Sequence, residues 1–345
     1  MAVRVGINGF GRIGRSVFKA LYGQYGDAIT VVAANDLGDV DTMAHLLKYD
    51  SIYGRVGARH GDAIAIERSA TGLVVGEHAL RLLHERDPAR LPWGALGVDI
   101  VIESTGSCTD AEQARAHLAG GAKKVIITAP AQGEDITLCM GVNEDRYDPA
   151  RHTIVSNASG TTNALAPVAK VVLEEFGVLQ GLVTAVHSYT AGQRLLDNKH
   201  ADLRRGRTGR TNIVPTTTGA AQAVALVLPE LQGKFDGVAL RIPSSIVSIV
   251  DFVARVERAT TVEALNAAFR ARAAGDMAGI LGYTEEPLVS SDFRADSRSS
   301  IVDGLATLVI GGDLIKVFAW YDNEWGYACR VAELTAFMAR RGFDR

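Results

Sequence analysis

A glycine cluster near the start of the chain constrains the fold more than any other feature. Residues 9–14 read G-F-G-R-I-G; they follow a short apolar run at 3–7 and open a segment, 13–21, whose apolar residues recur at helical spacing. A second apolar run at 29–34 is followed by Asp36. In a chain with 36 glycines, the G-x-G-x-x-G pattern alone has little weight. Its place between a strand and a helix, with an acidic residue after the next strand, predicts a dinucleotide-binding turn.

The residue types in this cluster suit a dinucleotide. Gly9 permits a tight turn, Gly11 lets the backbone approach the pyrophosphate, and Gly14 allows the helix to pack closely on the strand. The pyrophosphate would lie at the helix N-terminus, where N–H groups and the helix dipole favour anions. Asp36 should accept hydrogen bonds from the adenosine ribose hydroxyls, and its charge would repel a 2′-phosphate. The predicted cofactor is therefore NAD rather than NADP; the alternative is a glycine turn in an α/β protein that binds no nucleotide.

Strand and helix patterns alternate through the first half of the chain. Apolar runs at 99–104 and 124–128 flank a helical pattern at 111–119, and strands separated by helices of that kind form parallel sheets. The second half has a helical pattern at 262–274 and longer β-type runs at 183–189, 237–242, 245–256, 305–310 and 314–321. We therefore predict an α/β Rossmann domain followed by an α+β domain built on a mostly antiparallel or mixed sheet.

Composition excludes several classes of protein. The 345 residues suggest two domains, at ~150 residues each. A net charge of −3 gives no bulk basic field to hold nucleic acid or an anionic membrane. The three cysteines form no C-x-x-C pair, which argues against a disulfide framework and a cysteine-based metal site. Because the chain shows no leader pattern and no apolar stretch of ~18 residues, we expect a cytoplasmic protein without a membrane span.

Longer motifs carry a resemblance to one enzyme family. Residues 156–167 read S-N-A-S-G-T-T-N-A-L-A-P, and residues 321–327 read Y-D-N-E-W-G-Y. Further matches are G-I-N-G-F-G-R-I-G-R at 6–15, E-S-T-G at 103–106, M-G-V-N at 140–143, D-L-R-R at 202–205, P-T-T-T-G-A-A at 215–221 and L-P-E-L at 228–231. Together they span nearly the whole chain and resemble the phosphorylating glyceraldehyde-3-phosphate dehydrogenases. The related erythrose-4-phosphate dehydrogenases share most of these motifs, so the motifs define the family more sharply than the substrate.

The resemblance implies an architecture and an assembly. The NAD-binding domain would comprise residues 1–159 with a C-terminal helix at about 323–345, and the catalytic domain would comprise 160–322. The polar, basic segment 195–215 resembles the loop that packs across a subunit interface beside the neighbouring subunit's cofactor. A homotetramer is the usual assembly in this family.

The resemblance also implies a mechanism. In the family, a cysteine after S-N-A-S attacks the aldehyde, a histidine acts as base while hydride passes to the nicotinamide, and phosphate releases an acyl phosphate. His187 matches that histidine, and Asn323 matches the residue that orients the nicotinamide amide. The positions that match the binding residues for the substrate phosphate or the attacking phosphate are Ser159, Thr161, Thr190, Arg205, Thr218, Gly219 and Arg241. Further cofactor contacts are implied at Arg12, Ile13, Arg86, Thr105 and Thr128.

The chain departs from the family at the residue that its chemistry needs most. Gly160 stands where the family has its nucleophilic cysteine, and none of the chain's own cysteines, Cys108, Cys139 and Cys329, lies in this motif. Glycine has no side chain and cannot form a thiohemiacetal or a thioester. Loss of a catalytic nucleophile can cost roughly 10⁶-fold in kcat, so ordinary phosphorylating activity should be nearly absent.

Three functions are compatible with this departure. Further changes at Gly192, Asn198 and Lys199 favour a divergent paralogue that binds NAD and a phosphorylated or anionic substrate, including an NAD-derived one, and transfers hydride without a covalent intermediate. The change at Gly160 alone would fit an engineered, nucleophile-minus variant of an ordinary dehydrogenase. The third is a catalytically silent NAD-binding protein. In none of them do we expect a metal, a nucleic acid or a membrane as partner.

Overall fold

The computed structural model describes residues 2–56 and 63–343, which divide into two compact units. The first unit is made of three segments, Met1–Leu138, Asp145–Ala158 and Ala328–Arg345. The second is made of two, Cys139–Glu144 and Ser159–Tyr327.

The first unit is built on a nine-stranded sheet with the order β10-β11-β9-β8-β1-β2-β7-β6-β5. Its strands are β1 (Val3–Asn8), β2 (Ile29–Asn35), β5 (Ile66–Ser69), β6 (Gly72–Val75), β7 (His78–Leu83), β8 (Ile100–Glu103), β9 (Lys124–Ile127), β10 (Ile136–Thr137) and β11 (Ile154–Ser156). Neighbours from β10 to β7 are parallel, which confirms the predicted Rossmann domain. The antiparallel extension of β7, β6 and β5 was not part of the sequence prediction.

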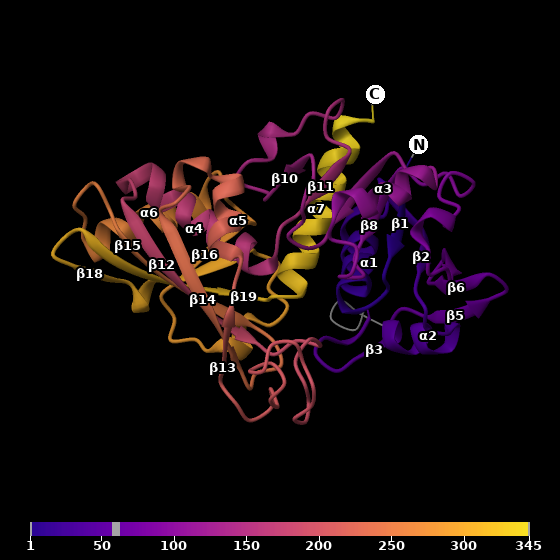
Figure 1. The fold of residues 1–345 in the computed structure, drawn as a ribbon. Helices are drawn as coiled ribbons and strands as arrows, with labels where there is room; N and C mark the ends of the chain where they lie inside the picture. The colour runs from indigo at the N-terminus through magenta and orange to yellow at the C-terminus, as the bar shows by residue number, and fades with distance from the viewer. Residues whose placement is uncertain (1, 57–62, 344–345) are drawn as a thin grey trace. The chain divides into compact units, whose positions relative to one another are not determined.

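Short helices and turns connect these strands, as Figure 1 shows in indigo and magenta. The helices are α1 (Arg12–Tyr25), α2 (Val40–Lys48) and α3 (Ala111–Ala119), with one-turn helices at Pro88–Arg90 and Glu144–Arg146 and a small hairpin of β3 (Tyr49–Asp50) and β4 (Gly54–Arg55). Asp39 and Asp110 cap α2 and α3 by accepting hydrogen bonds from backbone N–H groups of the first turn. The last helix, α7 (Trp325–Arg341, yellow in Figure 1), begins in the second unit, and its residues from Ala328 onward belong to the first.

The second unit is built on an eight-stranded mixed sheet with the order β13-β14-β12-β15-β19-β17-β16, with β18 paired to β19. Its strands are β12 (Gln180–Ser188), β13 (Val214–Thr217), β14 (Phe235–Ile242), β15 (Ser248–Arg255), β16 (Leu281–Thr284), β17 (Ser300–Asp303), β18 (Leu308–Ile310) and β19 (Leu314–Tyr321). The pairs β12–β14 and β16–β17 are parallel, and the other pairs are antiparallel. The mixed sheet agrees with the predicted fold class.

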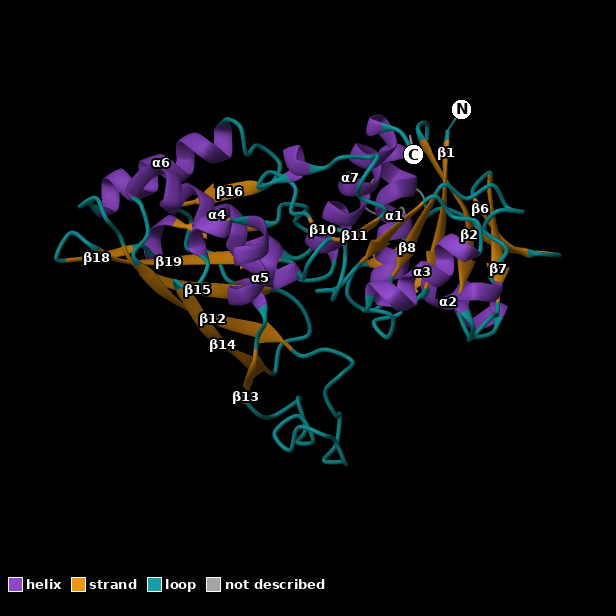
Figure 2. Cartoon of the chain, turned by 45° about the horizontal axis from the view of Figure 1, so that its top comes forward, coloured by secondary structure: helices purple, strands orange, loops and turns teal. Residues whose placement is uncertain are grey.

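Helices cover one face of this sheet, as Figure 2 shows. They are α4 (Gly160–Phe176), α5 (Ala220–Val227) and α6 (Val262–Ala274), with one-turn helices at Pro229–Leu231, Ser290–Phe293 and Gly304–Ala306. Side chains along β15 and β19 alternate between buried and half-buried, because only one face of each strand packs on the helices. The first half of α4 is buried almost all round, from Thr161 to Ala169.

Some element bounds differ from the sequence prediction. The predicted strand at 305–310 is shorter, because a one-turn helix at Gly304–Ala306 leaves only β18, Leu308–Ile310, to pair with β19. Within the second unit, the side chains of Ser188 and Ser248 donate hydrogen bonds to Asn323. No helix among the described residues is both long and apolar enough to cross a membrane.

Candidate functional site

The glycine cluster of the first unit lies at the carboxyl ends of its parallel strands. Gly9 follows β1 with a φ of +90°, and a Cβ there would meet backbone atoms of Ser104 and Thr105 at 2.6 to 2.8 Å. A Cβ on Gly14 would lie 2.1 Å from the Gly9 carbonyl oxygen, so α1 packs this closely on the turn only with glycine there. A Cβ on Gly11, by contrast, would meet nothing within 4 Å. The space beside Gly11 is therefore open, at the first turn of α1.

Asp36, just beyond the end of β2, is tied to this turn. Its Oδ2 accepts a hydrogen bond from the Phe10 backbone N–H at 2.8 Å, and its Oδ1 accepts one from the Gly38 backbone N–H at 3.0 Å. Each carboxylate oxygen can accept a second hydrogen bond, so the side chain retains capacity for ribose hydroxyls. An open helix N-terminus beside a half-buried carboxylate fits the diphosphate and ribose of NAD.

Arg12 and Ile13, the first residues of α1, lie where backbone N–H groups suit an anion. The Arg12 guanidinium pairs with Asp50 at 3.3 Å and lies over the ring of Tyr53, 5.8 Å from its centroid. The predicted contribution of Arg12 to cofactor binding is therefore that of its backbone, because its side chain is engaged with Asp50.

The other predicted cofactor residues of this unit follow neighbouring strands at the same sheet edge. Thr105 comes after β8, Thr128 directly after β9, and Arg86 after β7. The Thr128 hydroxyl donates to the Glu103 carbonyl oxygen at 3.0 Å, while Arg86 and Thr105 are exposed. Because these strands are parallel, the residues that follow them lie together at the carboxyl ends of the sheet, where ligands of doubly wound folds bind.

A buried hydrogen-bond network lies beneath this edge. The Oε2 atom of Glu103 accepts from the Asn8 amide at 2.6 Å and lies 3.0 Å from Nε2 of His117, and Oε1 accepts from the Thr105 backbone N–H and hydroxyl at 2.8 and 2.5 Å. Trp93 donates its indole N–H to Nδ1 of His117 at 3.1 Å. Because an indole nitrogen only donates, His117 carries its proton on Nε2 and donates it to Glu103. Glu103 thereby joins β1, β8 and α3.

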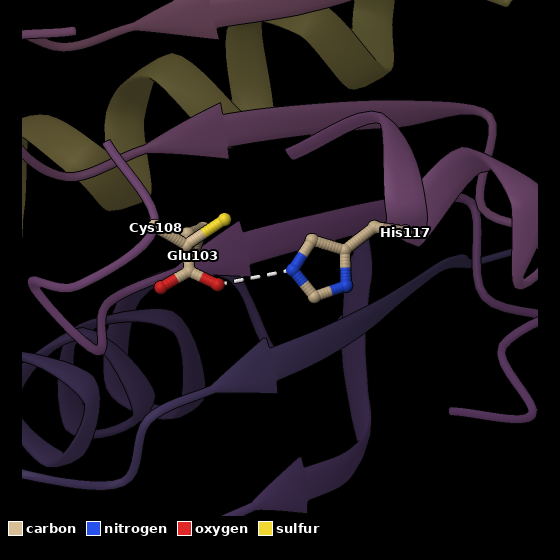
Figure 3. A group of neighbouring side chains, drawn as sticks. All are labelled: Glu103, Cys108 and His117. Carbon is tan, nitrogen blue, oxygen red and sulfur yellow. Dashed lines mark hydrogen bonds and ion pairs between the residues drawn. The ribbon is translucent and has the colours of Figure 1, made fainter. Parts of the chain in front are cut away.

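Cys108 completes a group that has the residue types of a metal site. Its ligand atom and those of Glu103 and His117 all lie within 4.8 Å of one another. Figure 3 shows the three side chains together. A metal on His117 would need the Nε2 lone pair, but Nε2 carries the proton that goes to Glu103. Burial, with the nearby charges of Glu103 and Asp110, raises the pKa of the Cys108 thiol to about 11, which disfavours the thiolate that metals bind. The cluster therefore fits a structural network better than a metal centre.

In the second unit, residues 159–162 of the S-N-A-S-G-T-T motif form the N-cap and first turn of α4. Ser159 is the N-cap, and its Oγ accepts from the Thr162 backbone N–H at 3.0 Å. Gly160 is the first helical residue; a Cβ there would lie 3.3 Å from the Asn323 carbonyl oxygen and 3.7 Å from the Tyr327 Cβ. This contact is tighter than most Cβ contacts, so the Asn323 carbonyl would have to move by a few tenths of an ångström. The helical backbone at position 160 does not itself require glycine.

His187 lies near the end of β12, in register with Arg241 on β14. Its Nδ1 is 2.7 Å from the Ser188 carbonyl oxygen and 2.5 Å from Nη1 of Arg241. Burial, and then the positive charge of Arg241, lowers the pKa of His187 to about 3, so the imidazole is neutral at physiological pH. The ring packs edge-on against Tyr321, whose hydroxyl lies 2.9 Å from the hydroxyl of Thr161. These contacts link the histidine to the first turn of α4.

Two serines fix the amide of Asn323. The hydroxyls of Ser188 and Ser248 both donate to its Oδ1, at 2.9 and 3.1 Å, and the Ser188 backbone N–H donates to the Ser248 hydroxyl at 3.1 Å. Because Oδ1 accepts both hydroxyls, Nδ2 is the side that faces other acceptors. Sequence reasoning missed Ser188, Ser248 and Tyr321, although Ser188 adjoins the predicted histidine and Tyr321 opens the Y-D-N-E-W-G-Y motif.

Among the remaining predicted anion-binding residues that the structure describes, the two arginines interact with each other, whereas the other three do not hydrogen-bond to them. Burial lowers the pKa of Arg241, as does the nearby charge of Arg205, whereas Tyr321 acts in the opposite direction. Arg205 donates to the Thr216 hydroxyl at 2.8 Å. The other three, Thr190 after β12 and Thr218 and Gly219 before α5, share no hydrogen bond with either arginine within the described part of the chain.

None of the chain's three cysteines lies in the first turn of α4. Cys108, Cys139 and Cys329 are all buried. Burial, with the charge of Glu144, raises the pKa of Cys139 to about 12, which makes its thiolate inaccessible at neutral pH. Burial of all three thiols, and the raised pKa of Cys108 and Cys139, argue against a role as nucleophile.

Comparison with known proteins identifies relatives along the whole chain. Residues 3–111 match the family model described as the NAD binding domain of glyceraldehyde 3-phosphate dehydrogenase, and residues 159–323 match the model of its C-terminal domain. Among similar curated proteins, the glyceraldehyde-3-phosphate dehydrogenase of Geobacillus stearothermophilus is 56% identical over 342 residues, covering 99% of this chain and all of the relative. Glyceraldehyde-3-phosphate dehydrogenase 1 of Bacillus subtilis and the enzyme of Streptomyces coelicolor are each 53% identical with the same coverage.

Proposed function

The chain belongs to the glyceraldehyde-3-phosphate dehydrogenase family of NAD-dependent oxidoreductases, and from that premise we propose that it is a member without thiol chemistry. The observation that carries this proposal is Gly160 at the first turn of α4, in the position that resembles the family's cysteine. The helical backbone at this position does not require glycine, and a Cβ would need the Asn323 carbonyl to move by a few tenths of an ångström. No covalent acyl intermediate can form at residue 160.

The residues that remain support a direct oxidation. When bound, NAD supplies the hydride acceptor. In the hydrate of an aldehyde, removal of the hydroxyl proton and of the C–H hydride gives a carboxylic acid directly, with no phosphate consumed. The neutral imidazole of His187 is the base that would take the hydroxyl proton, on Nε2. Asn323, held through Oδ1 by Ser188 and Ser248, would offer Nδ2 to the nicotinamide amide.

We place the substrate among phosphorylated or otherwise anionic aldehydes and alcohols. Arg241 and Arg205 concentrate positive charge beside His187, and guanidinium groups bind phosphate oxygens through charge-assisted hydrogen bonds. Ser159, Thr161, Thr190, Thr218 and Gly219 are further candidates for anion contacts by their match to the family. By the same match, we propose a cytoplasmic homotetramer.

The test is NADH formation from glyceraldehyde 3-phosphate and NAD, with and without inorganic phosphate, for the unmodified chain and for Gly160→Cys. Gly160→Ala is the matched control, because it adds the same Cβ without a thiol. We expect phosphate-dependent NADH only from Gly160→Cys, with a gain that approaches roughly 10⁶-fold if the rest of the site is intact. Slow, phosphate-independent acid formation by the unmodified chain and Gly160→Ala would support direct oxidation.

Other results assign the other two functions. If Gly160→Cys reaches high phosphate-dependent turnover and the unmodified chain is inert with every aldehyde and alcohol tried, the chain is a nucleophile-minus form of an ordinary dehydrogenase. If neither turns over while calorimetry shows NAD binding, the chain is a silent NAD-binding protein. Phosphate-dependent turnover by the unmodified chain would contradict the proposal.

A further inference from the structure

The Nδ1 atom of His187 lies close to both a hydrogen-bond acceptor and a hydrogen-bond donor. Nδ1 lies 2.7 Å from the Ser188 carbonyl oxygen, which only accepts hydrogen bonds, and 2.5 Å from Nη1 of Arg241, which only donates them. A neutral imidazole carries one proton. Nδ1 can therefore donate to Ser188 or accept from Arg241, but it cannot do both.

The choice decides which nitrogen is the base. If Nδ1 accepts from Arg241, the imidazole proton is on Nε2, and Nε2 cannot take a proton from substrate. Arg241 Nη1 also lies 3.2 Å from the Ser188 carbonyl oxygen, so the guanidinium can satisfy both acceptors in this arrangement. If Arg241 moves away, Nδ1 carries the proton and donates it to Ser188, and Nε2 presents its lone pair.

Binding of an anion would move the Arg241 guanidinium away from Nδ1 of His187. Arg241 is half-buried, and no carboxylate pairs with it in the part of the chain that the structure describes. The positive charge of Arg205 acts on it, and a partly buried cation in this setting is poorly compensated until an anion binds. A phosphate oxygen is a far stronger acceptor for a guanidinium than a neutral imidazole nitrogen is.

We propose that Arg241 is a tautomer switch for His187, so that binding of a phosphate group at Arg241 moves the imidazole proton from Nε2 to Nδ1 and creates the base. Beyond holding substrate, Arg241 thus acts as a positioning residue for the proton of His187. In the absence of the anion, hydrogen bonds from Arg241 keep His187 inactive as a base. This inference rests on the proposed role of His187, but it concerns a proton position that can be observed without turnover.

The test is long-range ¹H–¹⁵N NMR on the full chain labelled with ¹⁵N-histidine, which distinguishes the two tautomers of each imidazole. His187→Gln assigns the signal among the chain's eight histidines. We expect the proton on Nε2 in the free chain and on Nδ1 after titration with inorganic phosphate, which needs no variant. Arg241→Met should hold the proton on Nδ1 with and without phosphate, whereas Arg207→Met, which removes a surface arginine paired with Asp197, should behave like the unmodified chain.

Two results would overturn the inference. One is a tautomer of His187 that phosphate does not change in the unmodified chain. The other is an Nε2-protonated imidazole in a folded Arg241→Met variant. Neither result bears on whether residue 160 supports acyl transfer, so the switch and the proposed function can fail separately.

Discussion

At the scale of single residues, Gly11 and Gly14 are both glycines of one motif but have opposite surroundings. An added Cβ meets nothing within 4 Å at Gly11 and lies 2.1 Å from a backbone oxygen at Gly14. Gly14→Ala should therefore lower the free energy of unfolding by about 1–3 kcal/mol through overpacking. Gly11→Ala should lower it by less than about 1 kcal/mol, the scale of a changed N-cap, yet weaken NAD binding because the methyl group enters the space proposed for the pyrophosphate. Urea unfolding and calorimetry with NAD separate the two effects; equal losses of stability would contradict this account.

His187 should make stability depend on pH. The unfolded chain binds its imidazole proton near the ordinary pKa of 6.5, whereas the folded chain binds it only near about 3. Between these values the unfolded state holds more protons, so the free energy of unfolding falls as pH is lowered from 6.5, by up to about 1.4 kcal/mol per pH unit. We expect His187→Gln to flatten the stability curve between about pH 6 and 5, measured by urea unfolding at fixed protein concentration. His45→Gln, at an exposed position, is the control, and an unchanged slope in His187→Gln would count against the low pKa.

At the scale of elements, Glu103 couples two strands and a helix beneath the predicted NAD edge. Glu103→Gln removes the charge that receives four hydrogen bonds and turns one acceptor oxygen into a donor facing other donors. We expect a loss of about 1–3 kcal/mol in the free energy of unfolding, together with weaker NAD binding through displacement of Thr105. Glu112→Gln, which breaks only an exposed ion pair with Arg115 on α3, should change stability by less than about 0.5 kcal/mol. Similar effects of the two substitutions would show that the network does not couple these elements.

The elements that the sequence predicts well are those with strong local patterns. The parallel strands around the glycine cluster are apolar runs bounded by turns, and the mixed sheet of the second unit follows from its long β-type runs. The β5–β7 extension was missed because residues of β5 such as Glu67 and Arg68 are exposed and give no buried pattern. The strand predicted from 305 failed because apolar composition cannot distinguish a one-turn helix from a strand end.

The candidate site was predictable in part for the same reason. His187, Asn323 and Gly160 stand in motifs that the chain shares with a known family. The contacts that set their chemistry, such as Arg241 on Nδ1 of His187 and two serines on Asn323, join residues more than fifty positions apart. Such contacts arise from sheet register, which places His187 opposite Arg241 only after β12 and β14 pair.

At the scale of the whole molecule, segment 195–215 exposes apolar side chains that favour an assembly. Leu203, Leu196 and Leu195 are 86%, 77% and 73% exposed, which is unusual for leucines unless a partner covers them. We expect analytical ultracentrifugation to show a tetramer, and Leu196→Asp combined with Leu203→Asp to shift it to smaller species. Leu179→Asp, at an exposed leucine outside the segment, should leave the tetramer intact. A monomer for the unmodified chain at micromolar concentration would contradict the proposed assembly.

This chain keeps the fold and the NAD-binding domain of its family, and we propose that it has no thiol for acyl transfer. Intact-protein mass spectrometry after mixing with the acyl phosphate of 3-phosphoglycerate tests this proposal, because the reagent acylates an active thiol without needing NAD. We expect no adduct on the unmodified chain or on Gly160→Ala, and one hydroxylamine-sensitive acyl group at residue 160 in Gly160→Cys. An acyl group on the unmodified chain, at Cys139 or any other residue, or a Gly160→Cys variant that stays unacylated, would contradict it.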